Sequence, residues 1–166
     1  MAEVVLDFHA IMDAFEEELR AVTKSDGSPA FVDVLAAEPY AAPPHPGPHC
    51  YYWYLGRTDS LAGQKTLANV MYSCVFQVTV IWALHDVAAL QAWNVEIATI
   101  DTAIRRKFRA NSTINASVND LEISDSDVGF IAFGMNARSS QPTHRAIEMQ
   151  IRLHNLEGEP ISATPN

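Results

Sequence analysis

The 166-residue sequence has little cysteine, since Cys50 and Cys74 are its only two. Small secreted domains are usually rich in disulfides, so we expect free, buried thiols and a reducing compartment. The first residues lack the basic and then apolar pattern of a secretory signal peptide. No apolar run approaches the ~20 residues that a membrane-spanning helix needs, so we expect no membrane partner.

Positive charge is also scarce, because eleven Lys and Arg stand against twenty Asp and Glu, a net charge of −9. A protein that grips nucleic acid is normally basic. The acidic balance therefore argues against DNA binding as the main task, although an acidic surface lets DNA slide past. Hydrophobic residues make up 48% of the chain, which is enough for one folded domain.

The clearest pattern in the sequence is an alternating segment followed by a helical one. Residues 72–82 place apolar side chains at every second position, which predicts a strand with one buried face. Residues 87–108 repeat apolar side chains every three or four positions, which predicts a helix with one buried stripe. That stripe consists of Leu90, Trp93, Ile97, Ile100, Ile104 and Phe108.

The other predicted elements complete an α+β fold. A first helix is predicted over residues 4–22, because apolar residues recur there with helical spacing and the Ser25–Pro29 segment ends it. Neighbouring strands joined by short turns are antiparallel, so we expect a mainly antiparallel sheet with two helices packed on one face. The remaining strand candidates are residues 31–35, 50–55, 117–123, 128–135 and 145–154.

We expect a single domain over residues 1–156 with two irregular segments. Residues 38–48 contain five prolines and are predicted to form a stiff, extended surface arm. Residues 56–69 are polar and show no period, which predicts a long loop. Residues 157–166 are rich in Gly, Pro, Ser and Thr and are predicted to form a flexible tail.

No motif in the sequence predicts catalysis, a cofactor or a metal. Residues 56–66 place six residues between two glycines and lack the Gly-Lys pair of a phosphate-binding loop. His45, His49 and Cys50 lie close together, but a structural zinc site needs a fourth ligand. We therefore expect a protein that is not an enzyme.

Four successive aromatic residues are the main indication of an interface. A half-buried strand covers only alternate side chains, so two of the four need cover elsewhere, and Tyr and Trp commonly anchor interfaces. Packing within the chain is the alternative. The candidate interface with another copy or a partner protein consists of Tyr51, Tyr52, Trp53, Tyr54, Arg57, Lys65, Glu16, Glu17, Arg105, Arg106 and Arg109.

Two clusters of opposite charge lie on the predicted helices. Glu16–Glu18 crowd the first helix, and basic side chains of residues 105–109 end the second. A solvated surface explains the first cluster structurally, and complementing the helix dipole explains the second. The functional hypothesis is that the acidic cluster of one copy pairs with the basic cluster of a neighbouring copy.

The layout as a whole resembles the tail terminator family of long-tailed bacteriophages, also called minor tail or tail-completion proteins. The similarity rests on the order and length of the elements, because the family has no short diagnostic motif. It covers residues 4–22, 39–54, 72–108, 128–135 and 145–154.

This resemblance implies a structural virion protein of the tail and neck, assembled in the host cytoplasm. Such proteins form a homo-oligomeric ring, typically a hexamer, that caps the tail tube and ends its polymerisation. The ring then binds the neck or head-completion protein and so joins tail to head. DNA would be only transit cargo, repelled by an acidic lumen, and ring closure would make each subunit interface heterologous.

Three alternatives remain open. A head-completion or stopper protein of the neck also forms a small ring. A cone-shaped α+β small-molecule-binding or isomerase domain is a second alternative, but such folds place an Asp/His pair in an apolar cone. The strand faces predicted to point inwards are apolar, which argues against this cone. An enzyme subunit or chaperone of unknown kind is the third.

Overall fold

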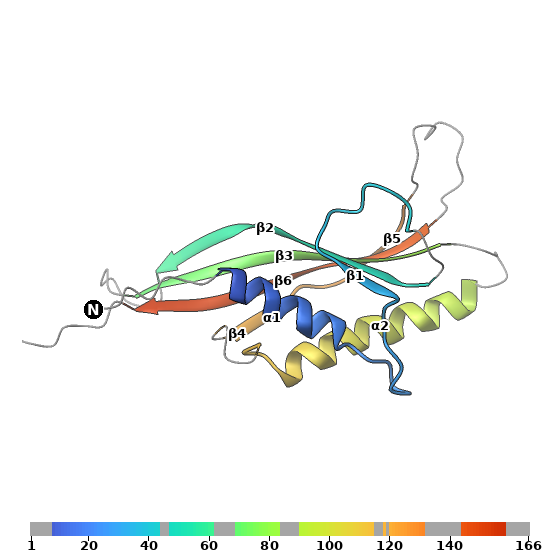
Figure 1. Cartoon of the computed structure of the whole chain (residues 1–166), viewed down its shortest axis with the longest axis horizontal. Coiled ribbons are helices and arrows are strands. Elements are labelled where there is room, and N and C mark those ends of the chain that lie inside the picture. The colour runs from blue at the N-terminus through green and yellow to red at the C-terminus, as the bar shows by residue number, and fades with distance from the viewer. Residues whose placement is uncertain are drawn as a thin grey trace, which may run out of the picture.

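The computed structural model describes residues 8–43, 47–61, 69–83, 90–114, 118, 120–131 and 144–158. Both described helices cover the same face of one sheet (Figure 1), which confirms the predicted α+β class. The elements in chain order are α1 (Phe8–Arg20), β1 (Asp33–Leu35), β2 (His49–Leu61), β3 (Asn69–Ala83), α2 (Leu90–Ala110), β4 (Asp120–Ile123), β5 (Asp127–Ile131) and β6 (His144–Gly158).

The described strands form a six-stranded sheet in the order β1-β2-β3-β6-β4, and β5 also pairs with β6. β1 is parallel to β2, because the 38–48 arm between them gives the long connection that parallel pairing needs. Every other described pair is antiparallel. β2, β3 and β6 contain 13, 15 and 15 residues, or about 40–50 Å at ~3.3 Å per residue.

The main core lies between the two helices and the sheet. The predicted strand is present, and Cys74, Phe76, Val78, Val80 and Trp82 join this core. The prediction that only one face is buried is wrong, because side chains on the other face, such as Thr79 and Ile81, are buried too. Aromatic rings from both helices meet there. The Phe15 ring centroid lies 4.7 Å from that of Phe76 and 5.4 Å from that of Phe108. These three rings tie α1, β3 and α2 together.

A smaller cluster lies on the sheet face away from the helices. Tyr51, Ile81 and Ala146 are buried there, and Leu35 and Trp53 pack against them. Thr79 is fully buried on the same face. Its neighbours across the ladder are Tyr51 and Glu148, so small side chains of the central strand lie between longer ones.

The loop predicted for residues 56–69 is wrong over much of its length. Residues 56–61 continue β2 and residue 69 already begins β3, while residues 62–68 lie outside the described residues. A β-bulge explains the error: Tyr54 pairs with Phe76 and Gly56 with Val75, so Leu55 is an extra residue. Gly56 has φ 154°, which suits glycine. The extra residue interrupts the alternation of side chains, so the sequence pattern did not indicate that the strand continues.

Other boundaries also differ from the predictions. β1 begins at residue 33 and β4 at residue 120, later than predicted, whereas β6 reaches residue 158 and so includes the start of the predicted tail. No helix or strand interrupts the described part of the 38–48 arm. Residues 1–7, 44–46, 132–143 and 159–166 lie outside the described residues.

Candidate functional site

Glu16, one of the predicted interface residues, is bound inside the chain. The Tyr52 hydroxyl donates a hydrogen bond to its carboxylate at 2.5 Å, and the Arg20 guanidinium lies 2.7 Å away. The Tyr52 hydrogen bond, followed by Arg20, holds the pKa of Glu16 below its ordinary value. Arg20 also donates to the carbonyl of Val34 at 2.8 Å. Glu16 therefore joins α1 to β1 and β2.

Glu18 connects the two helices. Its side chain is buried, the Lys107 ammonium lies 3.2 Å from its Oε2, and Asn111 donates to its Oε1 at 2.7 Å. Taking one partner away from a buried carboxylate is strongly destabilising. Part of the attraction between the acidic and basic clusters is thus made within one chain.

Arg105, another predicted interface residue, holds the edge of the sheet. Its guanidinium contacts Asp101 at 3.1 Å, the Ser124 carbonyl at 2.8 Å and the Ser126 hydroxyl at 2.7 Å. Ser126 also donates to Asp101. Ser124 and Ser126 lie in the break between β4 and β5, so α2 fixes this break in place.

The four successive aromatic residues alternate between the two faces of the sheet. Tyr52 and Tyr54 lie on the helix side, and Tyr51 and Trp53 on the other. Tyr51 and Tyr52 are buried within the chain, whereas Tyr54 is 41% exposed, with its ring 4.9 Å from that of Phe8. Internal packing accounts for the first two, and an interface role stays a prediction for Trp53 and Tyr54.

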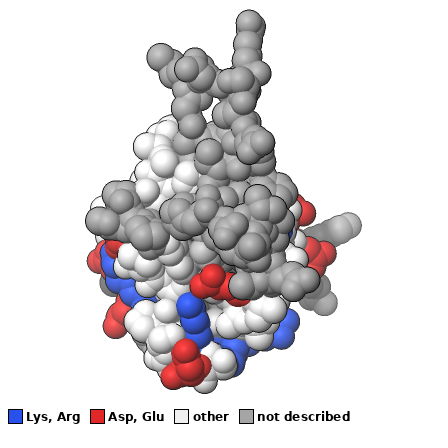
Figure 2. Space-filling model, turned by 90° about the vertical axis from the view of Figure 1, so that its right-hand side faces the viewer, with Lys and Arg blue, Asp and Glu red and all other residues white. Residues whose placement is uncertain are grey.

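The remaining predicted residues are charged and spread apart. Glu17, Arg106 and Arg109 are exposed on the helices, and Arg57 is exposed on β2 beyond the bulge. Figure 2 shows side chains of both signs over the lower part of the molecule, where the helices lie. Lys65 lies outside the described residues. The predicted set therefore spans both faces of the sheet and does not form one patch.

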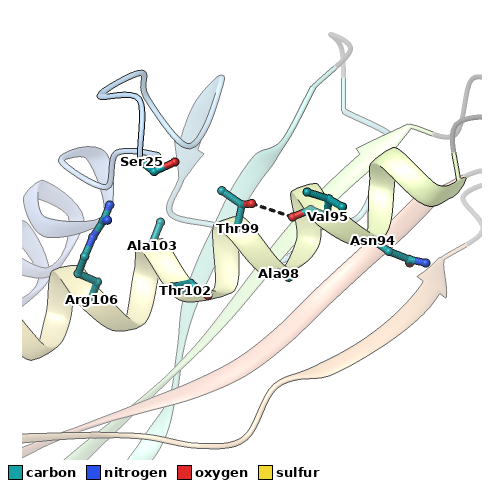
Figure 3. A pocket seen from close by; sticks show the side chains of 8 residues that line it. All are labelled: Ser25, Asn94, Val95, Ala98, Thr99, Thr102, Ala103 and Arg106. Carbon is teal, nitrogen blue, oxygen red and sulfur yellow. Dashed lines mark hydrogen bonds between the residues drawn. The ribbon is translucent and has the colours of Figure 1, made fainter.

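A shallow groove of about 530 Å³ follows the outer side of α2, and it was not predicted. Seven lining residues come from α2 and one from the turn after α1 (Figure 3). The absence of charge from one helical stripe of residues 94–102 was the sequence signal for it. The lining residues are Ser25, Asn94, Val95, Ala98, Thr99, Thr102, Ala103 and Arg106.

A serine, a histidine and a glutamate meet on the sheet face away from the helices. Ser73 Oγ lies 2.8 Å from His154 Nδ1, and His154 Nε2 lies 3.8 Å from Glu122. These residue types occur in hydrolase triads. Ser73, however, is buried in the central strand, where the surrounding N–H groups belong to the ladder and leave no oxyanion hole. The geometry therefore fits a structural role, in which these side chains link β3, β6 and β4.

The two cysteines are free and buried, as predicted. Burial raises the pKa of the Cys50 thiol, which keeps it protonated and unreactive. His49 and Cys50 are adjacent in β2 and point to opposite faces, and His45 lies outside the described residues. Over the part of the chain that the structure describes, no three His, Cys, Asp or Glu side chains gather as metal ligands.

Comparison of the sequence with protein families and with curated proteins gave no match. Among the described helices, neither is long and apolar enough to cross a bilayer. What the chain does is therefore inferred from its architecture and its surfaces.

Proposed function

We propose that this chain is a structural, non-enzymatic virion protein, the tail terminator of a long-tailed bacteriophage. A ring of its copies, a hexamer, would cap the tail tube, end tube polymerisation and bind the neck protein. The observation that supports this most is the long antiparallel sheet over a short helix layer. β2, β3 and β6 extend past the first described residue of α1 (Figure 1), so one end of the sheet can reach a neighbouring subunit or the tube.

The charge at the exposed positions of the sheet face away from the helices supports a lumen through which DNA passes. By the register, Asp120, Glu122, Asp127 and Glu148 all share the face away from the helices, and all four are exposed. Arg152 is an exposed guanidinium on that face. A face of this kind turned towards the lumen would repel the phosphate backbone.

The space where a cone-shaped pocket would lie is filled with side chains. Phe15, Phe76, Phe108 and Trp82 occupy the layer between helices and sheet, and all are buried. The groove on α2 is lined by a single titratable residue, Arg106, so it offers no acid–base pair. Both observations favour a structural role over the small-molecule alternative.

The test is the mass of the purified protein over a concentration series, with and without tail tubes of the same phage. We expect a hexamer in solution, or a monomer that forms a six-fold ring at one end of each tube under the electron microscope. Tube growth should stop when the protein is added. A strict monomer or dimer that never joins tubes would overturn the proposal, and a ring that binds the neck connector but not tubes would indicate the stopper alternative.

A further inference from the structure

We propose that the outer sides of α1 and α2 are complementary surfaces by which one copy of this chain binds another. The inference rests on the proposed ring, because each copy in a ring needs two surfaces that fit one another. We define the acidic stripe as Ala10, Asp13, Glu17 and Ala21. We define the basic stripe as Val95, Ala98, Thr102, Arg106 and Arg109.

The acidic stripe follows one side of α1. Its residues are three or four positions apart, which places them on the same side of a helix, and all of them are exposed. Ala21 directly follows α1, and its N–H still bonds to the Glu17 carbonyl at 3.0 Å. The core residues Phe15 and Leu19 lie on the opposite side. The stripe contains two carboxylates, two small side chains and no cation.

The basic stripe follows one side of α2. Its five residues are also three or four positions apart and exposed, and Val95 is 68% exposed. Its first half lines the groove of about 530 Å³, with Arg106 at one end of that groove (Figure 3). Arg109 lies one turn beyond. The stripe therefore contains a small, uncharged half and a cationic half.

Most other charges of the helix layer are neutralised within the chain. Glu16 pairs with Arg20, Glu18 with Lys107, Glu96 with Lys24, and Asp101 with Arg105. Across the described residues, no ion pair involves Asp13, Glu17 or Arg109. The exposed charges left on the outer sides of the two helices thus divide by sign between the stripes.

Within one copy, Arg106 donates to the Thr23 carbonyl, just after α1, at 3.0 Å. No ion pair among the described residues joins the two stripes. A second copy can present the acidic stripe to the basic one. Small side chains on both stripes let helices approach at the usual 8–10 Å between axes, and the contact would cover Val95. In a ring, each copy would use its acidic stripe on one neighbour and its basic stripe on the other.

The test uses two charge-reversed variants and their mixture. The first carries Asp13→Lys and Glu17→Lys, so both of its stripes are basic; the second carries Arg106→Glu and Arg109→Glu, so both are acidic. We expect each variant alone to self-associate at least about tenfold more weakly than the wild-type protein, because like charges then face each other. An equimolar mixture should recover association near the wild-type level, measured by analytical ultracentrifugation.

A third variant is the matched control, with Asp127→Lys and Glu148→Lys on the far face of the sheet. It changes the net charge as much as the first variant and should associate like the wild-type protein. Thermal melts show whether each variant is folded. Recovery in the mixture does not depend on these melts, since a misfolded variant would not be rescued.

Normal assembly of either charge-reversed variant would overturn the inference, and so would failure of the mixture to recover. A wild-type protein that stays monomeric both in solution and with tubes would overturn it as well. Tube capping is scored separately. Stripe-dependent assembly without tube capping would uphold the inference and remove the proposed function. If both reversed variants still capped tubes, the inference would be overturned and the proposed function would stand.

Discussion

The two edges of the sheet are held by the same kind of contact, in which an arginine of a helix binds a carboxylate of that helix and a backbone carbonyl at the sheet edge. At β1, Arg20 pairs with Glu16 four residues earlier and donates to the Val34 carbonyl. At the break between β4 and β5, Arg105 pairs with Asp101 and donates to the Ser124 carbonyl. At each edge a hydroxyl also donates to the carboxylate.

The difference between the edges lies in that hydroxyl. At the first edge it belongs to Tyr52, whose ring is 1% exposed and packs in the core, 5.6 Å from the Phe15 ring. At the second edge it belongs to Ser126, which lies in the break itself. The first edge is therefore coupled to core packing, and the second is a local contact. Two of the charged residues that suggest an interface in the sequence, Glu16 and Arg105, thus hold the sheet.

The largest effect should come from Tyr52→Ala. This change removes a buried ring as well as the hydroxyl, and we expect a loss of about 3–5 kcal/mol in the free energy of unfolding. Urea denaturation measures it, and Tyr52→Phe is the control that keeps the ring. If both variants lost the same stability, the edge would not be coupled to the core.

Replacing the two arginines should give smaller and unequal effects. Arg105 makes several polar contacts and its side chain is only 20% exposed, whereas that of Arg20 is 51% exposed. We expect Arg105→Gln to lower the free energy of unfolding by about 1–2 kcal/mol and Arg20→Gln by about 0–1 kcal/mol. If urea denaturation gave the reverse order, the exposure of the arginine side chain would not determine how much its contacts stabilise the sheet edge.

Ser126→Ala should be milder than Arg105→Gln. It removes hydrogen bonds to Asp101 and Arg105 without leaving a core cavity, so we expect a loss of about 0.5–1.5 kcal/mol. Hydrogen exchange should show faster exchange at β4 and β5 and unchanged exchange at β1. Equal changes at both edges would contradict the local character of this contact.

The smallest effect should be a pH dependence specific to the first edge. Tyr52 and Arg20 lower the pKa of Glu16, so its contribution is present above the unfolded pKa, about 4.3, and is lost as the pH falls below it. Burial, with the Glu16 hydrogen bond, raises the pKa of Tyr52, so its contribution is lost as the pH rises above about 10. Thermal melts of Glu16→Gln should lose the acid dependence, and those of Tyr52→Phe the alkaline one.

The periodic parts of the fold were predictable from the sequence, because periods of 2 and 3.6 report which side chains face the core. Strand β3 and both helices follow this rule. The continuation of β2 past Leu55 was not predictable, because a bulge breaks the period. The i,i+4 pairs Glu16–Arg20 and Asp101–Arg105 are visible in the sequence. Their backbone acceptors are not, since those lie 14 and 19 residues away in the chain.

The candidate site was predictable only in part, because partners that are distant in the chain are not visible in the sequence. Charge and aromatic clusters identified residues with polar or large side chains, but only the fold decides which of them are used internally. Glu16, Arg105, Tyr51 and Tyr52 are bound or buried within the chain. The groove on α2 consists mainly of small, uncharged residues, which no motif search selects.

The bulge at Leu55 also bears on how the chain can change in length. Leu55 is the unpaired extra residue, and it is 49% exposed. A deletion of this one residue would leave Gly56 opposite Val75 and Arg57 opposite Cys74, so every later side chain of the hairpin would keep its face. The chain can therefore gain or lose one residue at this position without moving the side chains that follow to the other face of the sheet.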